Sequence, residues 1–169
     1  MTHKKCLHLK MKLTKIFFLL IVLLAFYSCS SDDDICIGGE ATPRMKIKFK
    51  TEATGKLKTL DSLYVNVDYG SGPVSVIARK VKTDSVYIPL RVDENPYTEI
   101  YVGLSKAAIS SKIKINYTTS SQYVSPACGV KKIYENVNSS VETANPVVGA
   151  EQPQTQIIDE NKTHLFLLF

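Results

Sequence analysis

Beyond about residue 43, apolar residues recur at every second position in several short segments, and this alternation restricts the fold more than any other feature. Residues 45–50 alternate methionine, isoleucine and phenylalanine with lysine. Residues 63–69 and 112–118 repeat the pattern. Since successive side chains of a β-strand point to opposite sides, such segments are typical of strands with one buried face. No segment shows a sustained helical period.

The number and spacing of these segments predict the fold class. Turn-forming residues separate them, as in Gly70-Ser71-Gly72-Pro73 and Asp93-Glu94-Asn95-Pro96. About eight short strands indicate an all-β fold, an antiparallel β-sandwich of immunoglobulin-like type, with a flattened barrel as the alternative. About 125 residues is enough for one such core. The expected strands are 45–50, 63–69, 73–81, 84–90, 97–104, 112–118, 130–137 and 163–169.

Two local features refine this prediction. Pro89 lies within the segment 84–90 and marks an edge strand or a bulge, because proline donates no ladder hydrogen bond. Residues 138–160 are polar and lack strong periodicity, so we expect a long surface connection. A hairpin of residues 155–158 with 163–169, turning at 159–162, is expected to close the fold. One face of its last strand, Leu165, Leu167 and Phe169 or His164, Phe166 and Leu168, should pack in the core.

The first 28 residues have the features of a signal peptide. Lysines precede the apolar run 16–24, and the small residue Ser28 precedes Cys29. This arrangement resembles the lipobox of bacterial lipoproteins, in which the cysteine thiol is acylated, typically with palmitate, although Phe26 stands where a lipobox usually has leucine. The whole apolar stretch 16–27, about 12 residues, falls short of the roughly 20 that cross a bilayer. An ordinary signal peptide and an uncleaved anchor are the alternatives, and Met11 is a second candidate start.

Cleavage before Cys29 removes the net charge. The leader holds five of the 21 basic residues and no acidic ones, so 16 basic residues remain against 16 acidic ones. A nucleic-acid partner would need a basic footprint, and we therefore expect none. The chain divides into the signal peptide (1–28), an acylated acidic tether (29–42) and the β-sandwich domain (43–169).

Cys36 and Cys128 are the cysteines that remain once Cys6 is removed and Cys29 is acylated. In an exported chain two thiols favour one disulfide. It would close a loop of about 90 residues, for which chain entropy suggests roughly 4–5 kcal/mol. Two free thiols or half of a metal site are the alternatives. A zinc site would lack partners, because His164 is the only histidine after the leader.

A resemblance to a known family rests on short elements spread along the chain. They are Cys36, Thr42-Pro43-Arg44, Pro89-Leu90, Cys128-Gly129 and the aromatic and aliphatic C-terminal strand. Together they resemble a family of small lipoproteins of Bacteroidota that carry a domain of unknown function. The resemblance covers most of the chain after the leader. It implies a β-rich exported lipoprotein with Cys36 and Cys128 paired, and no activity.

Two sets of residues are similar to modification or export signals of that phylum. The tract Ser30, Ser31, Asp32, Asp33 and Asp34 is similar to the signal that sends lipoproteins to the outer face of the outer membrane. A solvated acidic tether is the alternative. Ser62 and Ser85 stand in Asp-Ser-apolar tripeptides similar to O-glycosylation sites, although such tripeptides are frequent by chance.

The search for catalytic chemistry finds no candidate. His164 reads as a strand histidine, and Ser125 has no other histidine that could activate it. The three aspartates of the tether lack the glycine and distal glutamate of an EF-hand, and the glycine pairs are turns without the lysine of a phosphate loop. We therefore expect no catalytic residue, no metal and no cofactor.

Tyr64, Tyr87 and Tyr101 lie opposite the aliphatic faces of their strands and are a candidate binding strip, because tyrosine offers flat contact area at low entropy cost. Tyrosines on the second face of a sandwich are also common without a ligand, and the absence of tryptophan argues against a carbohydrate platform. The sequence thus predicts a non-catalytic envelope lipoprotein, anchored to the outer membrane at its periplasmic face or the cell surface, that binds a protein or glycan. A structural accessory subunit of a larger outer-membrane complex is the alternative.

Overall fold

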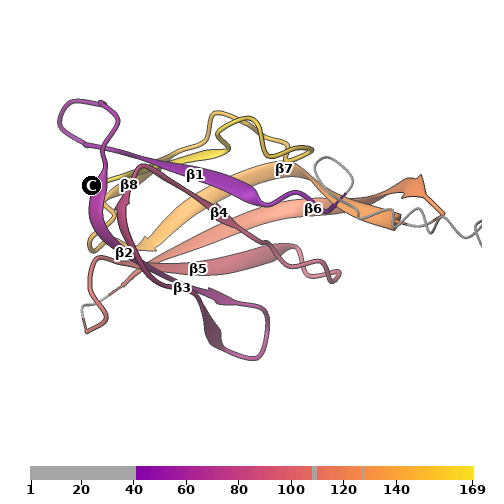
Figure 1. The fold of residues 1–169 in the computed structure, drawn as a ribbon, viewed down its shortest axis with the longest axis horizontal. Coiled ribbons are helices and arrows are strands. Elements are labelled where there is room, and N and C mark those ends of the chain that lie inside the picture. The colour runs from indigo at the N-terminus through magenta and orange to yellow at the C-terminus, as the bar shows by residue number, and fades with distance from the viewer. Residues whose placement is uncertain (1–40, 108–109, 127) are drawn as a thin grey trace, which may run out of the picture. The chain divides into compact units, whose positions relative to one another are not determined.

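A computed structural model describes residues 41–107, 110–126 and 128–169. These residues form nine strands and no helix (Figure 1). The signal peptide, Cys29, the tract from Ser30 to Asp34, and Cys36 lie outside the described residues. The strands are β1 (Met45–Lys50), β2 (Leu60–Asp68), β3 (Pro73–Thr83), β4 (Ser85–Ile88), β5 (Tyr97–Gly103), β6 (Ser111–Ser125), β7 (Gly129–Thr143), β8 (Gly149–Glu151) and β9 (Leu165–Leu168).

The strands form two sheets that pack face to face as a β-sandwich, which confirms the predicted fold class. One sheet has the order β4-β1-β9-β8 and the other the order β3-β2-β5-β6-β7. All pairings between the described strands are antiparallel except that of β1 with β9, which is parallel. The parallel pair consists of the first and last described strands, which lie side by side in the centre of the smaller sheet.

Alternation along the strands produces the core. In β1 the residues Met45, Ile47 and Phe49 are each at most 1% exposed, while the three lysines between them point outward. Strands β2, β6 and β9 bury alternate residues in the same way. The inward side chains of both sheets meet in one hydrophobic cluster. The alternation of apolar and polar residues in the sequence therefore corresponds to the alternation of buried and outward side chains in the strands.

The C-terminal segment belongs to the core, and Leu165 and Leu167 are buried. The ring of Phe169 meets that of Phe49 edge to face, with centroids 5.8 Å apart. The hairpin expected for this region is wrong, because β9 pairs with β8 at Gly149–Glu151. Ile157 instead forms a bridge with Tyr134 of the other sheet. The strand β8 escaped prediction because three residues carry no readable alternation.

Strand β4 lies at an edge of its sheet and ends at Ile88, directly before Pro89. The interpretation of Pro89 as the mark of an edge strand is therefore confirmed.

Strands β6 and β7 are much longer than expected and run beyond the ends of the other strands (Figure 1). We call their distal part, residues 120–126 and 128–133, the arm. None of its described residues is buried. At its base the register shifts, and Asn136 takes a positive φ of 53° while its amide donates to the Thr118 hydroxyl. Such a bulge bends a strand pair locally, and it separates the arm from the sandwich body.

Candidate functional site

Two of the three tyrosines predicted to bind a ligand lie together on the outer face of the five-stranded sheet. Tyr64 of β2 stands opposite Gly103, and Tyr101 of β5 stands opposite Asn66 on the neighbouring strand. Both rings are partly buried, and the aliphatic residues beside them point into the core. The diagonal arrangement brings the two rings within reach of one ligand, since diagonal neighbours lie about 7–8 Å apart.

A pocket of about 360 Å³ opens between these two rings. Its walls combine aromatic rings with an amide, several hydroxyls and one ammonium group. A lining of this kind offers flat apolar contact together with many hydrogen-bonding groups, which suits a polar ligand rich in hydroxyls or peptide groups. The lining residues are Tyr64, Asn66, Ser75, Ala78, Tyr101, Ser105, Lys106 and Ser110.

Charged residues hold Tyr101 in place at the border of the pocket. Lys112 is the register partner of Tyr101 on β6, and its ammonium lies 2.9 Å from Glu99 and 3.1 Å from Glu142. The hydrogen bonds that Lys112 donates to these two carboxylates raise its pKa. The Tyr101 hydroxyl donates to Glu99 over 3.2 Å, and burial followed by the charge of Glu99 raises the pKa of Tyr101. The ring is thus fixed by its own strand neighbours, as a binding residue should be.

Tyr87 does not join the other two tyrosines, because it lies on β4 in the other sheet. The three residues therefore do not form one strip. The ring of Tyr87 borders a separate pocket of about 280 Å³ and has two cations over it, Arg44 at 5.0 Å and Lys46 at 5.5 Å from its centroid. Arg44 is also paired with Glu160, at 2.8 Å. These contacts already occupy the face of the ring.

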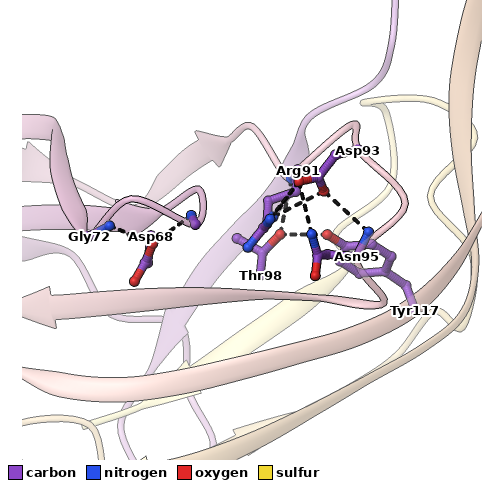
Figure 2. A network of polar contacts seen from close by, with 8 residues as sticks. Asp68, Gly72, Arg91, Asp93, Asn95, Thr98 and Tyr117 are labelled. Atoms are coloured by element: carbon purple, nitrogen blue, oxygen red, sulfur yellow. Dashed lines mark hydrogen bonds and ion pairs between the residues drawn. The ribbon is translucent and has the colours of Figure 1, made fainter.

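A second polar cluster lies where β4 leads into β5, and Figure 2 shows it. The Arg91 guanidinium pairs with Asp93 at 2.5 Å, and Asn95 donates to the same carboxylate over 3.0 Å. The pKa of Asp93 falls to about 2, chiefly through the hydrogen bond from Arg91. The backbone N–H of Arg91 donates to Thr98, whose hydroxyl lies 2.6 Å from that of the buried Tyr117.

This cluster stabilises the fold and is not a candidate binding site. Its charged and hydroxyl groups satisfy one another, and the Arg91 side chain is only 10% exposed. The guanidinium lies so close to Gly70 that a Cβ there would stand 2.8 Å from Arg91 Nη2. The neighbouring turn is closed by Asp68, which accepts from the N–H groups of Gly70 and Gly72 (Figure 2). A ligand would have to displace these internal partners.

The remaining predicted residues of the described chain are found in ordinary structural positions. The Ser62 hydroxyl donates to the carbonyl of Leu104, and that of Ser85 donates to Asp84 over 3.0 Å. His164 is buried, its Nδ1 accepts from the backbone N–H of Lys46 over 2.9 Å, and burial lowers its pKa. Cys128 is disulfide-bonded. Its predicted pairing with Cys36 stays a prediction, because Cys36 is outside the described residues.

Within the described residues, no group of three or more histidine, cysteine, aspartate or glutamate side chains is placed to hold a metal ion. The same residues contain no helix long and apolar enough to cross a membrane.

The sequence did not indicate most of the pocket. Alternation places Tyr64 and Asn66 on one side of β2 and Tyr101 on one side of β5, but it says nothing about which strands are neighbours. The loop residues Ser105, Lys106 and Ser110 carried no signal at all. Only the register of β2 against β5 brings these groups together.

Comparison with known proteins gives a family and nothing more specific. No curated protein and no solved structure matches this chain. A family model does match, over residues 50–169, which takes in every strand from β2 onward. This match confirms that the chain carries a domain of unknown function, and the chain belongs to the family of unknown function DUF6452.

Proposed function

We propose that this protein is a non-catalytic envelope lipoprotein whose sandwich binds a glycan or a protein segment in the pocket between Tyr64 and Tyr101. The pocket is the observation that supports the proposal, because it combines two aromatic rings, of which Tyr101 is held by Glu99, with hydroxyl and amide groups. No carboxylate lines the described part of the pocket, and Glu99 and Glu142 beside it are both paired with Lys112.

The cellular part of the proposal rests on the sequence. A leader with a cysteine at its cleavage site supports acylation of Cys29 and attachment to the outer membrane, as in lipoproteins of Bacteroidota. Metabolic labelling with a fatty-acid probe should mark the protein, and Cys29→Ala should abolish the label. Cys6→Ala is the matched control and should keep it, because Cys6 lies within the leader. Label that persists on Cys29→Ala would contradict the lipid anchor.

The binding part is tested with a matched pair of tyrosine variants on β5 and a third variant on β2. Tyr101 and Tyr97 both point to the outer face of β5, but only Tyr101 lines the pocket. The full chain, purified in detergent, is screened against envelope polysaccharides and peptides. Tyr101→Ala and Tyr64→Ala should weaken binding of any ligand found, while Tyr97→Ala should bind like the unchanged chain. Equal binding by all three variants would show that the pocket is not the site.

One feature favours the alternative, an accessory subunit of a larger outer-membrane complex. Strand β3 is a free edge of the five-stranded sheet, and its Val74 and Val81 are exposed. Exposed edges with apolar side chains are suited to pairing with another chain. A membrane protein that co-purifies at a fixed ratio, and is lost on Val81→Lys but not on Tyr101→Ala, would support this function instead.

A further inference from the structure

The tip of the arm presents a pair of large apolar side chains to solvent. Tyr123 of β6 and Val130 of β7 are register partners, and they are 65% and 63% exposed. Directly opposite residues of an antiparallel pair project on the same side. They therefore form one small apolar surface, at the end of a ribbon that reaches beyond the rest of the domain (Figure 1).

The described part of the chain begins beside the arm. The backbone N–H of Lys132 donates to the hydroxyl of Thr42 over 3.0 Å. Lys132 is two residues from Val130, which is about 7 Å along a strand. From there β1 leads away, toward the loop between β1 and β2 that carries Leu57. The segment that joins the domain to Cys29 is thus attached at the arm end of the sandwich.

Chain length limits how far the arm tip can be from the bilayer, once the proposed acylation of Cys29 is accepted. Thirteen residues separate Cys29 from Thr42. Fully extended they span at most about 45 Å. Should Cys128 pair with Cys36, as predicted, the free tether shortens to seven residues, or about 25 Å. At either length the chain enters the domain beside the arm, so the arm is within reach of the bilayer.

The chemistry of the tip suits a lipid surface. A tyrosine has an apolar ring and a polar hydroxyl, and it is enriched at membrane–water interfaces for that reason. Lys132 lies two residues beyond Val130, on the same side of the strand, and brings positive charge toward the phosphates of lipid headgroups. A protein partner could bind such a group of tyrosine, valine and lysine at any place on the domain. A bilayer can be reached only near the point where the tether is attached.

We propose that the arm tip, through Tyr123 and Val130, contacts the headgroup region of the bilayer that holds the acyl chains of Cys29. This rests on the proposed lipid anchor and deepens it, because the arm then orients the domain rather than attaching it. Tyr101, at the edge of the binding pocket, is the register partner of Lys112 near the start of β6. Tyr123 lies eleven residues further along that strand, or about 36 Å. The pocket is therefore held away from the membrane, open to its ligand.

The chain lacks tryptophan, so one substitution creates a unique fluorescent reporter. The full acylated chain carrying Tyr123→Trp is reconstituted into vesicles of phosphatidylethanolamine and phosphatidylglycerol, with and without brominated acyl chains that quench tryptophan. The matched control is Leu57→Trp, at a side chain that is equally exposed, 64%, but lies at the other end of β1. We expect blue-shifted, severalfold more strongly quenched emission from Tyr123→Trp than from Leu57→Trp. Adding Val130→Asp to the Tyr123→Trp chain should remove most of that quenching.

The fatty-acid label on the same samples separates the two proposals. A labelled chain whose Tyr123→Trp emission is unquenched overturns the arm contact and leaves the anchor standing. Equal quenching of both reporters also overturns it, because the domain would then lie on the membrane without the arm directing it. A chain that carries no label overturns the anchor, and the arm contact with it.

Discussion

The two halves of the β6–β7 hairpin differ in what holds them. In the half within the sandwich, Ile113, Ile115 and Tyr117 are buried against the opposite sheet. In the arm none of the described residues is buried, and the strands are held by each other and by the disulfide-bonded Cys128. One continuous pair of strands thus passes from a region stabilised by hydrophobic burial to one that has no core and is held by hydrogen bonds and the disulfide. The first region contributes residues to the hydrophobic core, whereas the second is exposed to solvent on both faces.

The largest expected effect comes from removing the last strand of the body. Deletion of residues 165–169 takes away the strand between β1 and β8, with Leu165 and Leu167 from the core. Burial of each such side chain contributes about 1.5–3 kcal/mol, against a total stability of about 5–15 kcal/mol for a typical domain. We expect the shortened chain to be unfolded or nearly so by urea titration followed with circular dichroism. An unchanged midpoint would show that the smaller sheet does not need β9.

A matched pair of alanine substitutions in the hairpin compares its two halves directly. Ile115→Ala leaves a cavity in the core and should cost about 2–5 kcal/mol. Val130→Ala removes an exposed side chain of the arm and should change the free energy of unfolding by less than about 0.5 kcal/mol. Both values come from urea midpoints of the full chain. A large loss in Val130→Ala would mean that the arm packs against something that stabilises the fold.

The turn between β2 and β3 offers a smaller test within the body. Gly70 and Gly72 both have a positive φ, of 106° and 103°. A side chain is strained at either position, at a cost of about 1–3 kcal/mol. Only at Gly70 would the new methyl group also meet Arg91, at 2.8 Å, whereas nothing lies within 4 Å at Gly72. Gly70→Ala should therefore lower the thermal midpoint more than Gly72→Ala, and the reverse order would contradict the packing of Arg91 on this turn.

The smallest expected effect is a dependence of stability on pH. Burial lowers the pKa of His164 below its usual 6.5 in the folded chain. The unfolded chain therefore takes up its proton first, and stability falls as pH drops through about 6.5 toward the folded pKa. His164 is the only histidine after the leader, and the lowered carboxyl pKa values of Asp93 and Glu160 act at lower pH. Unfolding of the chain should lose this slope between pH 7.5 and 5.5 in His164→Gln, and a slope that persists there would contradict the assignment.

How much the sequence could predict follows the same division. The bounds of β1 were predicted to the residue, because its lysines and apolar residues alternate without interruption. The strands of the arm were predicted too short, since beyond Tyr117 both faces of β6 meet solvent and the run from Thr118 to Gln122 is polar throughout. Alternation of apolar and polar residues indicates a strand with one buried face, and a strand without a buried face does not show it.

The candidate site was predictable only in part, for a different reason. The two tyrosines of the pocket could be placed on the outward faces of their strands, but Tyr87 had the same signal and lies on the other sheet. Neighbouring strands and their register are set by contacts between distant segments, as in the pairing of Asn66 with Tyr101. Those contacts produce no periodic pattern in the sequence, so the neighbouring strands could not be predicted from it.

Native-state amide hydrogen exchange along β6 and β7 of the full chain tests the division between body and arm most directly. The ladder amides around Ile113 and Ile115 should exchange only through global unfolding, with the free energy measured by urea. Those of residues 120–123 and 130–133 should exchange through local opening at a clearly lower free energy, because no core covers them. Exchange of the arm amides at the global free energy would contradict the account, since the arm would then be part of the cooperative fold.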